Sequence, residues 1–462
     1  MRSTLFCLAA VMGSTLYAWT PAPVRSDAAA VVDATSGDLD DQQGELRVTL
    51  DGTTRRLPRL AIPSFLTSGG DATLDETART VADVLWQDIN FEREFQMISQ
   101  QTAAMIPPAS AESLPYATWS QAGADEVLVG SVEFVDDTVM VEVRVMNVAR
   151  KISTFGKRYS CSAKSLRLCA HTISDEVHKE RFGLDGVART KLAFTSDRDG
   201  ERLVGTIEER SIKEIYIADY DGHGQRRVTV RGSLNLSPAW APDSRSITYQ
   251  SHKSGFVDIY IQQLYEIGLT RPAHGTDQAQ NFLPKFSPDG TRLVFASSRD
   301  GNWEIYTVKV DGTDLRRLTS NRADDGAPTW SPNGAQIAFT SDRTGSNQIY
   351  IMSADGGPAE KVTSEPRKAD RPTWALDYIA FSAEVPGGTE IKKVVLGTRQ
   401  TIQLTEGAGS NESPTVAPNG RHIAFVTTRW GKEQIAVIDA DGRNVRRITT
   451  AGNNRYPSWS NR

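Results

Sequence analysis

The side chains that could carry out chemistry are few and scattered. The sequence has no G-x-S-x-G, P-loop, G-x-G-x-x-G or H-E-x-x-H pattern, which are signatures of hydrolases, nucleotide-binding proteins and zinc peptidases. His171 and His178 lie seven residues apart on one expected helix, but no third ligand accompanies them. Asp219-Tyr220-Asp221-Gly222 is similar to the start of a calcium loop, yet Asp-Gly pairs recur at the same place in other repeats and favour a turn. We expect no metal and no cofactor.

Four carboxylates leave an enzyme or a lectin open as an alternative. They are Asp324, Asp325, Asp370 and Glu412, and each lies in a short segment that precedes a repeated proline. Two carboxylates that face each other across a cavity could hydrolyse a glycosidic bond. A cavity of this kind could equally hold a small ligand or a glycan.

These segments belong to a repeat that must position them. The repeated prolines are Pro238, Pro284, Pro328, Pro372, Pro414 and Pro457, separated by 46, 44, 44, 42 and 43 residues. Within one unit, Pro328 begins PTWSPNGAQIAFTSDRTGSNQIYIMSADGG, in which alternating stretches are separated by Asn-Gly, Thr-Gly and Asp-Gly turns. Four short strands at this period predict a blade of a β-propeller.

Counting the units predicts six blades. Five units begin at Pro238, Pro284, Pro328, Pro372 and Pro414. Residues 191–229 match the last three strands of a further unit. That unit has no P-x-W-S of its own, and the sequence Pro457–Ser460 near the C-terminus would supply it. Such a closure removes the free edges of the sheets.

The segments before the repeated prolines are the candidate binding site. We expect them to connect neighbouring blades and to gather around one mouth of the central channel, where loops on a rigid scaffold commonly bind partners. Polar side chains with one apolar anchor suit a protein or peptide partner; solvated loops without a partner are the alternative. The candidates are Asn235, Gln280, Asn281, Phe282, Leu283, Asp324, Asp325, Gly326, Asp370, Arg371, Asn411, Glu412, Arg455 and Tyr456.

The N-terminal part predicts an exported α/β domain. Residues 1–30 contain a signal peptide, residues 31–44 a disordered lead-in, residues 45–183 an α/β domain, and residues 187–462 the propeller. An alternating arm begins the domain and consists of Glu45, Leu46, Arg47, Val48, Thr49 and Leu50. We expect strands at residues 57–65, 95–98, 126–135, 139–148 and 152–159, and helices at residues 73–91, 116–122 and 164–182. The fold class is therefore an α/β domain followed by an all-β six-bladed β-propeller.

Cysteines and charge agree with this compartment. Cys7 lies in the signal segment, which leaves Cys161 and Cys169 either to form a disulfide or to remain two small buried thiols. The net charge of −5 argues against nucleic acid as the partner. Beyond the signal segment, no apolar stretch is long enough to span a membrane.

The chain resembles the TolB family, the periplasmic component of the Tol-Pal envelope system. The resemblance rests on the blade repeat, on AHTISDEVHKERFGLDGVARTKLAF at residues 170–194, and on the order of the segments. It implies a non-enzymatic, monomeric adaptor that supports outer-membrane integrity and cell division. A Pal-like peptidoglycan-associated lipoprotein would bind at the channel mouth, near Gln280, Leu283 and Gly326, and a TolA-like inner-membrane protein would bind the arm Glu45–Leu50.

Overall fold

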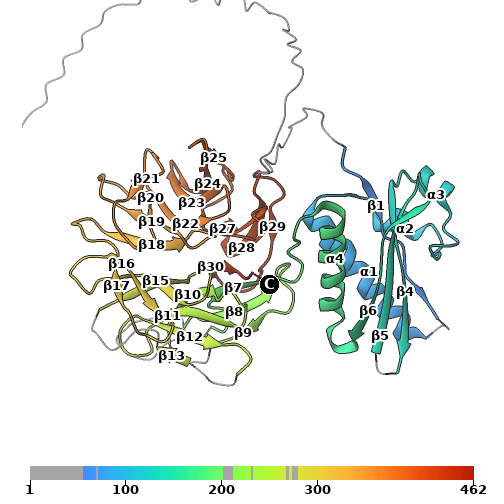
Figure 1. Cartoon of the computed structure of the whole chain (residues 1–462), viewed down its shortest axis with the longest axis horizontal. Coiled ribbons are helices and arrows are strands. Elements are labelled where there is room, and N and C mark those ends of the chain that lie inside the picture. The colour runs from blue at the N-terminus through green and yellow to red at the C-terminus, as the bar shows by residue number, and fades with distance from the viewer. Residues whose placement is uncertain are drawn as a thin grey trace, which may run out of the picture. The chain divides into compact units, whose positions relative to one another are not determined.

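The computed structural model describes residues 56–461, apart from residues 69–70, 137, 201–211, 230–232, 267–269 and 273–278. The predicted signal segment, the lead-in and the arm Glu45–Leu50 lie outside the described residues. The chain from Arg56 onward forms one compact unit. It comprises an α/β domain and a six-bladed β-propeller (Figure 1). Both parts of the predicted fold class are confirmed.

A mixed sheet is the centre of the α/β domain. Its order is β3-β1-β4-β5-β6, with β2 paired to β4. Strand β1 runs parallel to β3 and β4, whereas β4, β5 and β6 are antiparallel neighbours. The strands are β1 (Arg59–Ala61), β2 (Leu66–Thr67), β3 (Gln96–Met97), β4 (Glu126–Val135), β5 (Thr138–Asn147) and β6 (Ile152–Ser162).

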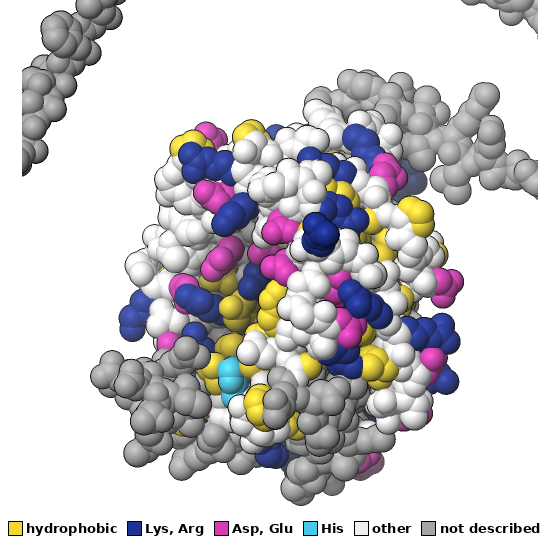
Figure 2. Space-filling view, turned by 90° about the vertical axis from the view of Figure 1, so that its left-hand side faces the viewer, with side chains coloured by type: hydrophobic (Ala, Val, Ile, Leu, Met, Phe, Trp, Pro, Cys, Tyr) yellow, Lys and Arg dark blue, Asp and Glu magenta, His cyan; other side chains and the backbone are white. Residues whose placement is uncertain are grey.

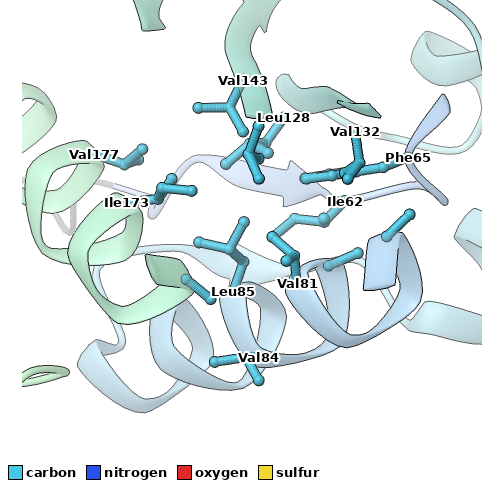
Figure 3. Packing of buried hydrophobic residues seen from close by; sticks show 14 of the residues in the cluster. Ile62, Phe65, Val81, Val84, Leu85, Leu128, Val132, Val143, Ile173 and Val177 are labelled. Atoms are coloured by element: carbon cyan, nitrogen blue, oxygen red, sulfur yellow. The ribbon is translucent and has the colours of Figure 1, made fainter. Parts of the chain in front are cut away.

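Two long helices cover one face of this sheet. The helices are α1 (Ala72–Glu92), α2 (Gln100–Ala104), α3 (Tyr116–Gln121) and α4 (Leu166–Phe182). Helix α1 begins where Asp71 accepts a hydrogen bond from the N–H of Thr73 at 2.8 Å, as an N-cap should. Val81 and Leu85 of α1 and Ile173 of α4 point toward the apolar face of the sheet (Figure 3). The sequence did not predict α2 or β2, which are only five and two residues long.

A disulfide ties helix α4 to the edge of the sheet. The structure joins the sulfur atoms of Cys161, in β6, and Cys169, in α4, with the two Cα atoms 5.8 Å apart. The bond closes a loop of only a few residues, so it fixes the start of α4 against β6.

The propeller consists of six four-stranded antiparallel sheets; five follow chain order from the inner strand outward, and the first takes the C-terminal strand as its inner strand. The first sheet is β30 (Asn454–Trp459), β7 (Lys191–Ser196), β8 (Glu214–Asp219) and β9 (Arg226–Arg227). The second is β10 (Asn235–Trp240), β11 (Ser246–Ser251), β12 (Asp258–Gln263) and β13 (Thr270–Pro272), and the third is β14 (Asn281–Phe286), β15 (Arg292–Ser297), β16 (Glu304–Lys309) and β17 (Arg316–Arg317). The fourth is β18 (Asp325–Trp330), β19 (Gln336–Ser341), β20 (Gln348–Ser353) and β21 (Glu360–Lys361). The fifth is β22 (Ala369–Trp374), β23 (Tyr378–Val385), β24 (Gly388–Val395) and β25 (Thr401–Gln403), and the sixth is β26 (Asn411–Val416), β27 (His422–Trp430), β28 (Lys432–Asp439) and β29 (Arg446–Arg447).

The C-terminal strand closes the ring, as the sequence predicts. Strand β30 pairs with β7, and Asn454 lies opposite Ser196 although 258 positions separate them. The propeller therefore has its first blade completed by the end of the chain.

A half-buried arginine secures four of the six blades. In the fourth sheet, Arg343 donates to both carboxylate oxygens of Asp325 at 3.0 and 2.9 Å and to the hydroxyl of Ser341 at 2.9 Å. Its guanidinium also lies 4.7 Å from the centre of the Tyr350 ring. In the first, third and sixth sheets Arg198, Arg299 and Arg429 bind a serine or threonine hydroxyl in the same way, and an asparagine oxygen takes the place of Asp325. The repeated Ser/Thr-x-Arg motif thus joins the first two strands of a blade.

The segments before the repeated prolines are not loops between blades, which corrects the prediction. They form the first half of each inner strand, and a β-bulge interrupts the pairing directly after them. The residue before each proline has a positive φ, between 47° and 56°, at Ser237, Leu283, Ala327, Arg371, Ser413 and Tyr456. Proline disfavours the right-handed helical conformation in the residue before it. The positive φ at this residue coincides with the β-bulge, which turns the residue toward the channel.

Candidate functional site

The six bulges build a ring inside the central channel. They enclose a cavity of about 50 Å³ whose wall alternates between the proline and the residue before it from every inner strand. Its lining residues are Ser237, Pro238, Leu283, Pro284, Lys285, Ala327, Pro328, Arg371, Pro372, Ser413, Pro414, Tyr456 and Pro457. The six prolines restrict the backbone of this ring, so its shape is fixed. The side chains of the residues beside the prolines then determine what the ring binds.

Two cations face this cavity. The guanidinium of Arg371 lies 4.7 Å from the centre of the Tyr456 ring, and its Nε is 3.9 Å from a carboxylate oxygen of Asp370. Lys285 lies one residue beyond Pro284, and burial, together with the charge of Arg371, lowers the pKa of its ammonium to about 8. Among the residues that the structure describes, no carboxylate lines the cavity.

A second cavity of about 330 Å³ lies further along the same strands. The tryptophans of the repeat line it, together with Lys285, which belongs to both cavities. The indole of Trp240 donates to the carbonyl of Ser458 at 3.2 Å, and that of Trp330 donates to the carbonyl of Lys285 at 3.4 Å. Each bond crosses from one sheet to its neighbour, so these two tryptophans pack between the blades.

Four of the predicted contact residues are buried, and we correct their role. Asn235, Asn281, Asp325 and Asn411 begin their inner strands and are at most 3% exposed. Their side chains bind within or between the blades: the amide of Asn235 donates to Glu214 at 2.9 Å and that of Asn411 donates to Glu390 at 2.9 Å. A partner at the mouth cannot reach these groups without opening a blade, so the sequence assigned structural residues to the surface.

The other ten predicted residues are partly or fully exposed around the ring. They are Gln280, Phe282, Leu283, Asp324, Gly326, Asp370, Arg371, Glu412, Arg455 and Tyr456. Phe282 packs edge-to-face on Trp303, with ring centres 5.0 Å apart, and Arg455 pairs with Glu433. Trp303, which the sequence did not single out, therefore belongs to this surface. The structure brings these residues together at one end of the inner strands.

Three of the four carboxylates that the enzyme alternative names, Asp324, Asp325 and Asp370, are already engaged. Asp325 is buried against Arg343, and one oxygen of Asp370 accepts bonds from the hydroxyl of Thr340 at 2.9 Å and from the N–H of Arg371 at 2.7 Å. Asp324 accepts a bond from the N–H of Trp303 at 3.1 Å. No group of three or more His, Cys, Asp and Glu side chains that could hold a metal ion occurs within the described residues.

Charges of both signs are mixed on the surface. Figure 2 shows one face of the molecule, on which basic and acidic side chains are interspersed among uncharged ones. This face therefore presents no single-sign patch of the kind that binds nucleic acid.

A second polar cluster joins the α/β domain to the propeller, and the sequence did not predict it. Asp88 of α1 is 1% exposed and accepts a hydrogen bond from the hydroxyl of Tyr220, after β8, at 2.6 Å. Its other oxygen lies 2.8 Å from Nδ1 of His171 in α4. Burial raises the pKa of Asp88, although His171 and Tyr220 counteract part of that shift.

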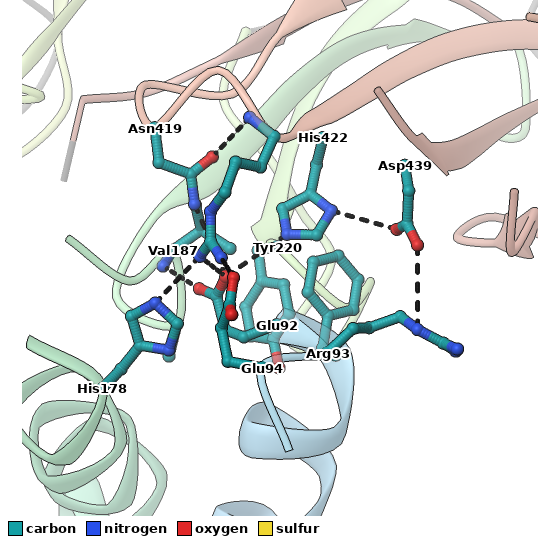
Figure 4. A network of polar contacts seen from close by, with 12 residues as sticks. Glu92, Arg93, Glu94, His178, Val187, Tyr220, Asn419, His422 and Asp439 are labelled. Atoms are coloured by element: carbon teal, nitrogen blue, oxygen red, sulfur yellow. Dashed lines mark hydrogen bonds and ion pairs between the residues drawn. The ribbon is translucent and has the colours of Figure 1, made fainter. Parts of the chain in front are cut away.

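The end of α1 carries the centre of this contact (Figure 4). Glu92 accepts a hydrogen bond from the N–H of Val187 at 2.6 Å and binds Arg421 of the sixth sheet. Nε2 of His422 lies 3.3 Å from the same carboxylate, and Arg421 also pairs with Glu94. These groups come from the end of α1, from the segment after α4 and from the start of β27, so the contact exists only in the folded chain.

His178 completes this cluster as a neutral acceptor. Its Nε2 lies 2.9 Å from Nη2 of Arg421, which can only donate. Burial and the charges of Arg421 and His422 lower the pKa of His178 to about 4, although Glu92 opposes the shift. Burial alone would raise the pKa of Glu92, but His422, Arg421 and His178 together lower it.

Aromatic packing surrounds the charges. Phe91 lies 4.6 Å from the Tyr220 ring and 4.7 Å from the His422 ring, and the guanidinium of Arg446 lies 4.0 Å from its centre. Arg446 donates to Asp439 at 2.9 Å. The spacing of His171 and His178 on one helix face was the sole sequence signal for this region, and it indicated packing rather than a metal site.

Within the described part of the chain, no helix has the length and apolar character needed to cross a membrane.

Two family models match the sequence. The one described as "TolB beta propeller domain" matches residues 182–462, which is more than half of the 462 residues. The one described as "TolB amino-terminal domain" matches residues 46–154. Together they cover all six blades and the α/β domain apart from residues 155–181.

Curated relatives and a solved structure agree with these matches. "Tol-Pal system protein TolB" of Desulfosudis oleivorans is 31% identical over 263 residues, which are 56% of this chain and 57% of the relative. The protein of the same name from Desulfotalea psychrophila is 27% identical over 265 residues, or 57% of this chain and 56% of the relative. The chain thus spans about half the length of the curated relatives it matches. The crystal structure of TolB from Acinetobacter baumannii shares the fold, with a TM-score of 0.74 and 24% identity over 88% of this chain and 97% of that one. On the propeller match, which covers more than half of its length, this chain belongs to the TolB family.

Proposed function

We propose that this protein is a non-enzymatic periplasmic adaptor of a Tol-Pal-like system. It docks a peptidoglycan-associated lipoprotein at the channel mouth and an inner-membrane protein through the arm Glu45–Leu50. In this way it supports outer-membrane integrity and cell division. Membership of the TolB family and the names of the curated relatives support the system to which we assign it.

The observation that carries the docking site is the exposed ring at one end of the inner strands. The second residue of each inner strand, such as Phe282 or Asp370, is partly exposed, and the third, such as Arg371, lines the channel. Aromatic and arginine side chains are typical of interface hot spots, and here they include Phe282, Trp303 and Tyr456. The closed sheets hold these side chains in fixed positions, so a partner meets a preorganised surface.

The arm supplies the second contact. Glu45–Leu50 alternates apolar and polar residues, as a segment that binds by strand addition does. If the arm and the channel mouth influence each other, the binding of one partner changes the affinity for the other by the same factor in both directions.

Capture from an envelope extract tests the docking site. The wild-type protein is compared with a mouth variant, Phe282→Ala/Asp324→Ala/Arg371→Ala, and captured proteins are identified by mass spectrometry. The matched control, Leu315→Ala/Arg316→Ala/Asp311→Ala, removes the same kinds of side chain from the turn between β16 and β17, which joins the opposite ends of the strands.

We expect a peptidoglycan-binding lipoprotein with the wild type and the control, and its loss with the mouth variant. Equal capture by all three proteins would move the site away from the mouth. Capture of no such lipoprotein by the wild type would refute the adaptor function.

A further inference from the structure

The channel contains a lysine that the protein does not neutralise. Lys285 extends from the inner strand β14 and lines both cavities. Within the described residues, its ammonium makes no hydrogen bond and no ion pair. Lys285 is partly exposed at the channel wall, where a positive charge is less well hydrated than in open solvent and gains from an accompanying anion.

A second cation with free hydrogen-bond donors lies in the same ring. Arg371 of β22 stacks on Tyr456, which leaves the edge of its guanidinium available. Its one carboxylate neighbour in the described residues, Asp370, is 3.9 Å from Nε, and that carboxylate already accepts bonds from Thr340 and from the backbone. The terminal nitrogens of Arg371 donate no hydrogen bond to any described residue.

The two cations destabilise each other. The charge of Arg371 and the burial of Lys285 are the causes of the lowered pKa of Lys285, which is about 8. An anion between them would favour both charged forms and would restore an ordinary lysine pKa. The cavity of about 50 Å³ is far smaller than a typical ligand pocket, but it can hold a small anionic group.

We propose that the channel interior is a carboxylate-binding site, in which Lys285 and Arg371 together hold one acidic side chain of a docked protein. This proposal rests on the proposed function, because it assumes that a protein covers the mouth. A guanidinium binds a carboxylate through two parallel N–H donors, and an ammonium adds a point charge beside it. The single acidic side chain would then fix the register of the partner on the ring.

A pair of blocked peptides tests the site without the natural partner. N-acetylated and C-amidated Gly-Gly-Asp-Gly-Gly is titrated into the full-length mature protein by calorimetry, beside the same peptide with Asn in place of Asp. The variants are Lys285→Met and Arg371→Met, which keep the length of the side chain. The control is Lys309→Met, which removes a lysine from the exposed end of β16 in the same blade as Lys285.

We expect the Asp peptide to bind the wild type and Lys309→Met equally, and Lys285→Met and Arg371→Met at least about tenfold more weakly. The Asn peptide should bind at least about tenfold more weakly than the Asp peptide. Equal binding of the two peptides, binding unaffected by Lys285→Met, or no binding up to tens of millimolar would each overturn the proposal.

A second readout excludes a purely structural effect of the variants. Lysines are reductively methylated with ¹³C, and the signal of Lys285 is assigned by its loss in Lys285→Arg. Its pKa should rise when the Asp peptide is added and stay unchanged with the Asn peptide. An unchanged pKa with saturating Asp peptide would contradict the site.

Sodium acetate distinguishes a free anion from a protein side chain. Acetate that binds as tightly as the Asp peptide would overturn the assignment to a protein partner. Failure of this inference is separable from failure of the proposed function. If the lipoprotein is captured but the Asp peptide does not bind, only the carboxylate site is wrong. If the peptide binds but no lipoprotein is captured, the docking function is wrong.

Discussion

The fourth blade and the contact between the domains both pair an arginine with a buried carboxylate, but they assemble the pair differently. In the fourth sheet, Asp325 begins β18 and Arg343, 18 residues later, follows the end of the adjacent strand β19. At the domain contact, Arg421 and Glu92 are 329 residues apart and come from a blade and a helix. The arginine of the first pair recurs in three other blades, where it binds an asparagine in place of Asp325, whereas the pair of Arg421 with Glu92 occurs once among the described residues.

This difference shows why one pair is visible in the sequence and the other is not. A local contact recurs with the repeat, so its residues form a motif, Ser/Thr-x-Arg, at a constant distance from the repeated proline. A pair that joins distant segments leaves no periodic trace, because each half looks like an ordinary surface charge until the domains are packed.

The fifth sheet shows that the blade can also do without the arginine. There Ala369, Ala383 and Val385 stand where Asp325, Ser341 and Arg343 stand in the fourth sheet. Strands β23 and β24 are eight residues long instead of six, and their hairpin has eight paired positions where that of the fourth sheet has six. The buried charge pair is therefore one solution to building a blade, and not a requirement of the fold.

The largest effect should come from breaking the pair inside a blade. Arg343→Ala leaves Asp325, which is fully buried, with Asn321 as its remaining side-chain partner. We expect the free energy of unfolding to fall by about 3 kcal/mol, because an uncompensated buried charge is costly. Chemical denaturation followed by circular dichroism measures the loss.

A double variant sharpens this result. Asp325→Ala/Arg343→Ala recreates the alanine of the fifth sheet and removes the stranded charge. It should be more stable than Arg343→Ala by at least about 1 kcal/mol. A double variant less stable than the single one would contradict the comparison with the fifth sheet.

Breaking the ion pair between the domains should lower the free energy of unfolding somewhat less. Arg421→Ala removes one partner of Glu92, but the N–H of Val187 and the ring of His422 remain. We expect a loss of about 2 kcal/mol, typical of a hydrogen bond to a charged group. Limited proteolysis should also cut the segment between α4 and β7 faster than in the wild type. Arg421→Lys keeps the charge without the forked geometry. Its free energy of unfolding should therefore lie between those of the wild type and Arg421→Ala.

Mild acid should weaken the domain contact through His178. The pKa of this histidine is about 4 when folded and about 6.5 when unfolded, so between these values the unfolded chain binds more protons. Its stabilising contribution is complete above about pH 6.5 and is lost as the pH falls toward about 4. From about pH 7.5 to about pH 5.5 we expect a loss of about 1 kcal/mol from this residue.

Denaturation at both pH values, with the wild type and His178→Gln, isolates this effect. The glutamine can still accept a bond from Arg421 but does not titrate. A pH dependence that is the same in both proteins would show that His178 does not carry it.

The smallest effect should come from an exposed pair in the fifth sheet. Arg367 lies 3.2 Å from Glu384, and both side chains are about half exposed. Arg367→Ala should change the free energy of unfolding by less than about 0.5 kcal/mol, since solvent screens such pairs. A loss of free energy as large as that of Arg343→Ala would mean that burial does not explain the different contributions of the two ion pairs to stability.

Much of the fold could be predicted because it is periodic. The interval between the repeated prolines indicated the blades, and the unmatched sequence at Pro457–Ser460 predicted the closure by β30. Helix α1 and strands β4 to β6 followed from their own apolar patterns. Strand β2 and helix α2 were missed because two and five residues are too few to show a pattern.

The structure places the variable residues before the prolines around the channel, and their role in binding stays a prediction. Because the sequence indicated connections between blades at these positions and not strands, it did not show that alternate residues face opposite ways. Asn281 therefore turned out to be buried while Phe282 is partly exposed. The bulge at Leu283, which points the third residue into the channel, is a backbone conformation that the residue types do not reveal.

The sequence by itself determined the number of blades, the closure of the ring by Pro457–Ser460 and the family, because each of these depends on local or repeated patterns. Only the tertiary structure decided which side chains line the channel and which bind across the domains. Lys285 and Arg371 are 86 positions apart, and Glu92 and Arg421 are farther still. Charges so distant in the chain influence each other only after closure of the ring places Lys285 and Arg371 around one cavity and packing of the domains pairs Glu92 with Arg421, because partial burial weakens the screening by water.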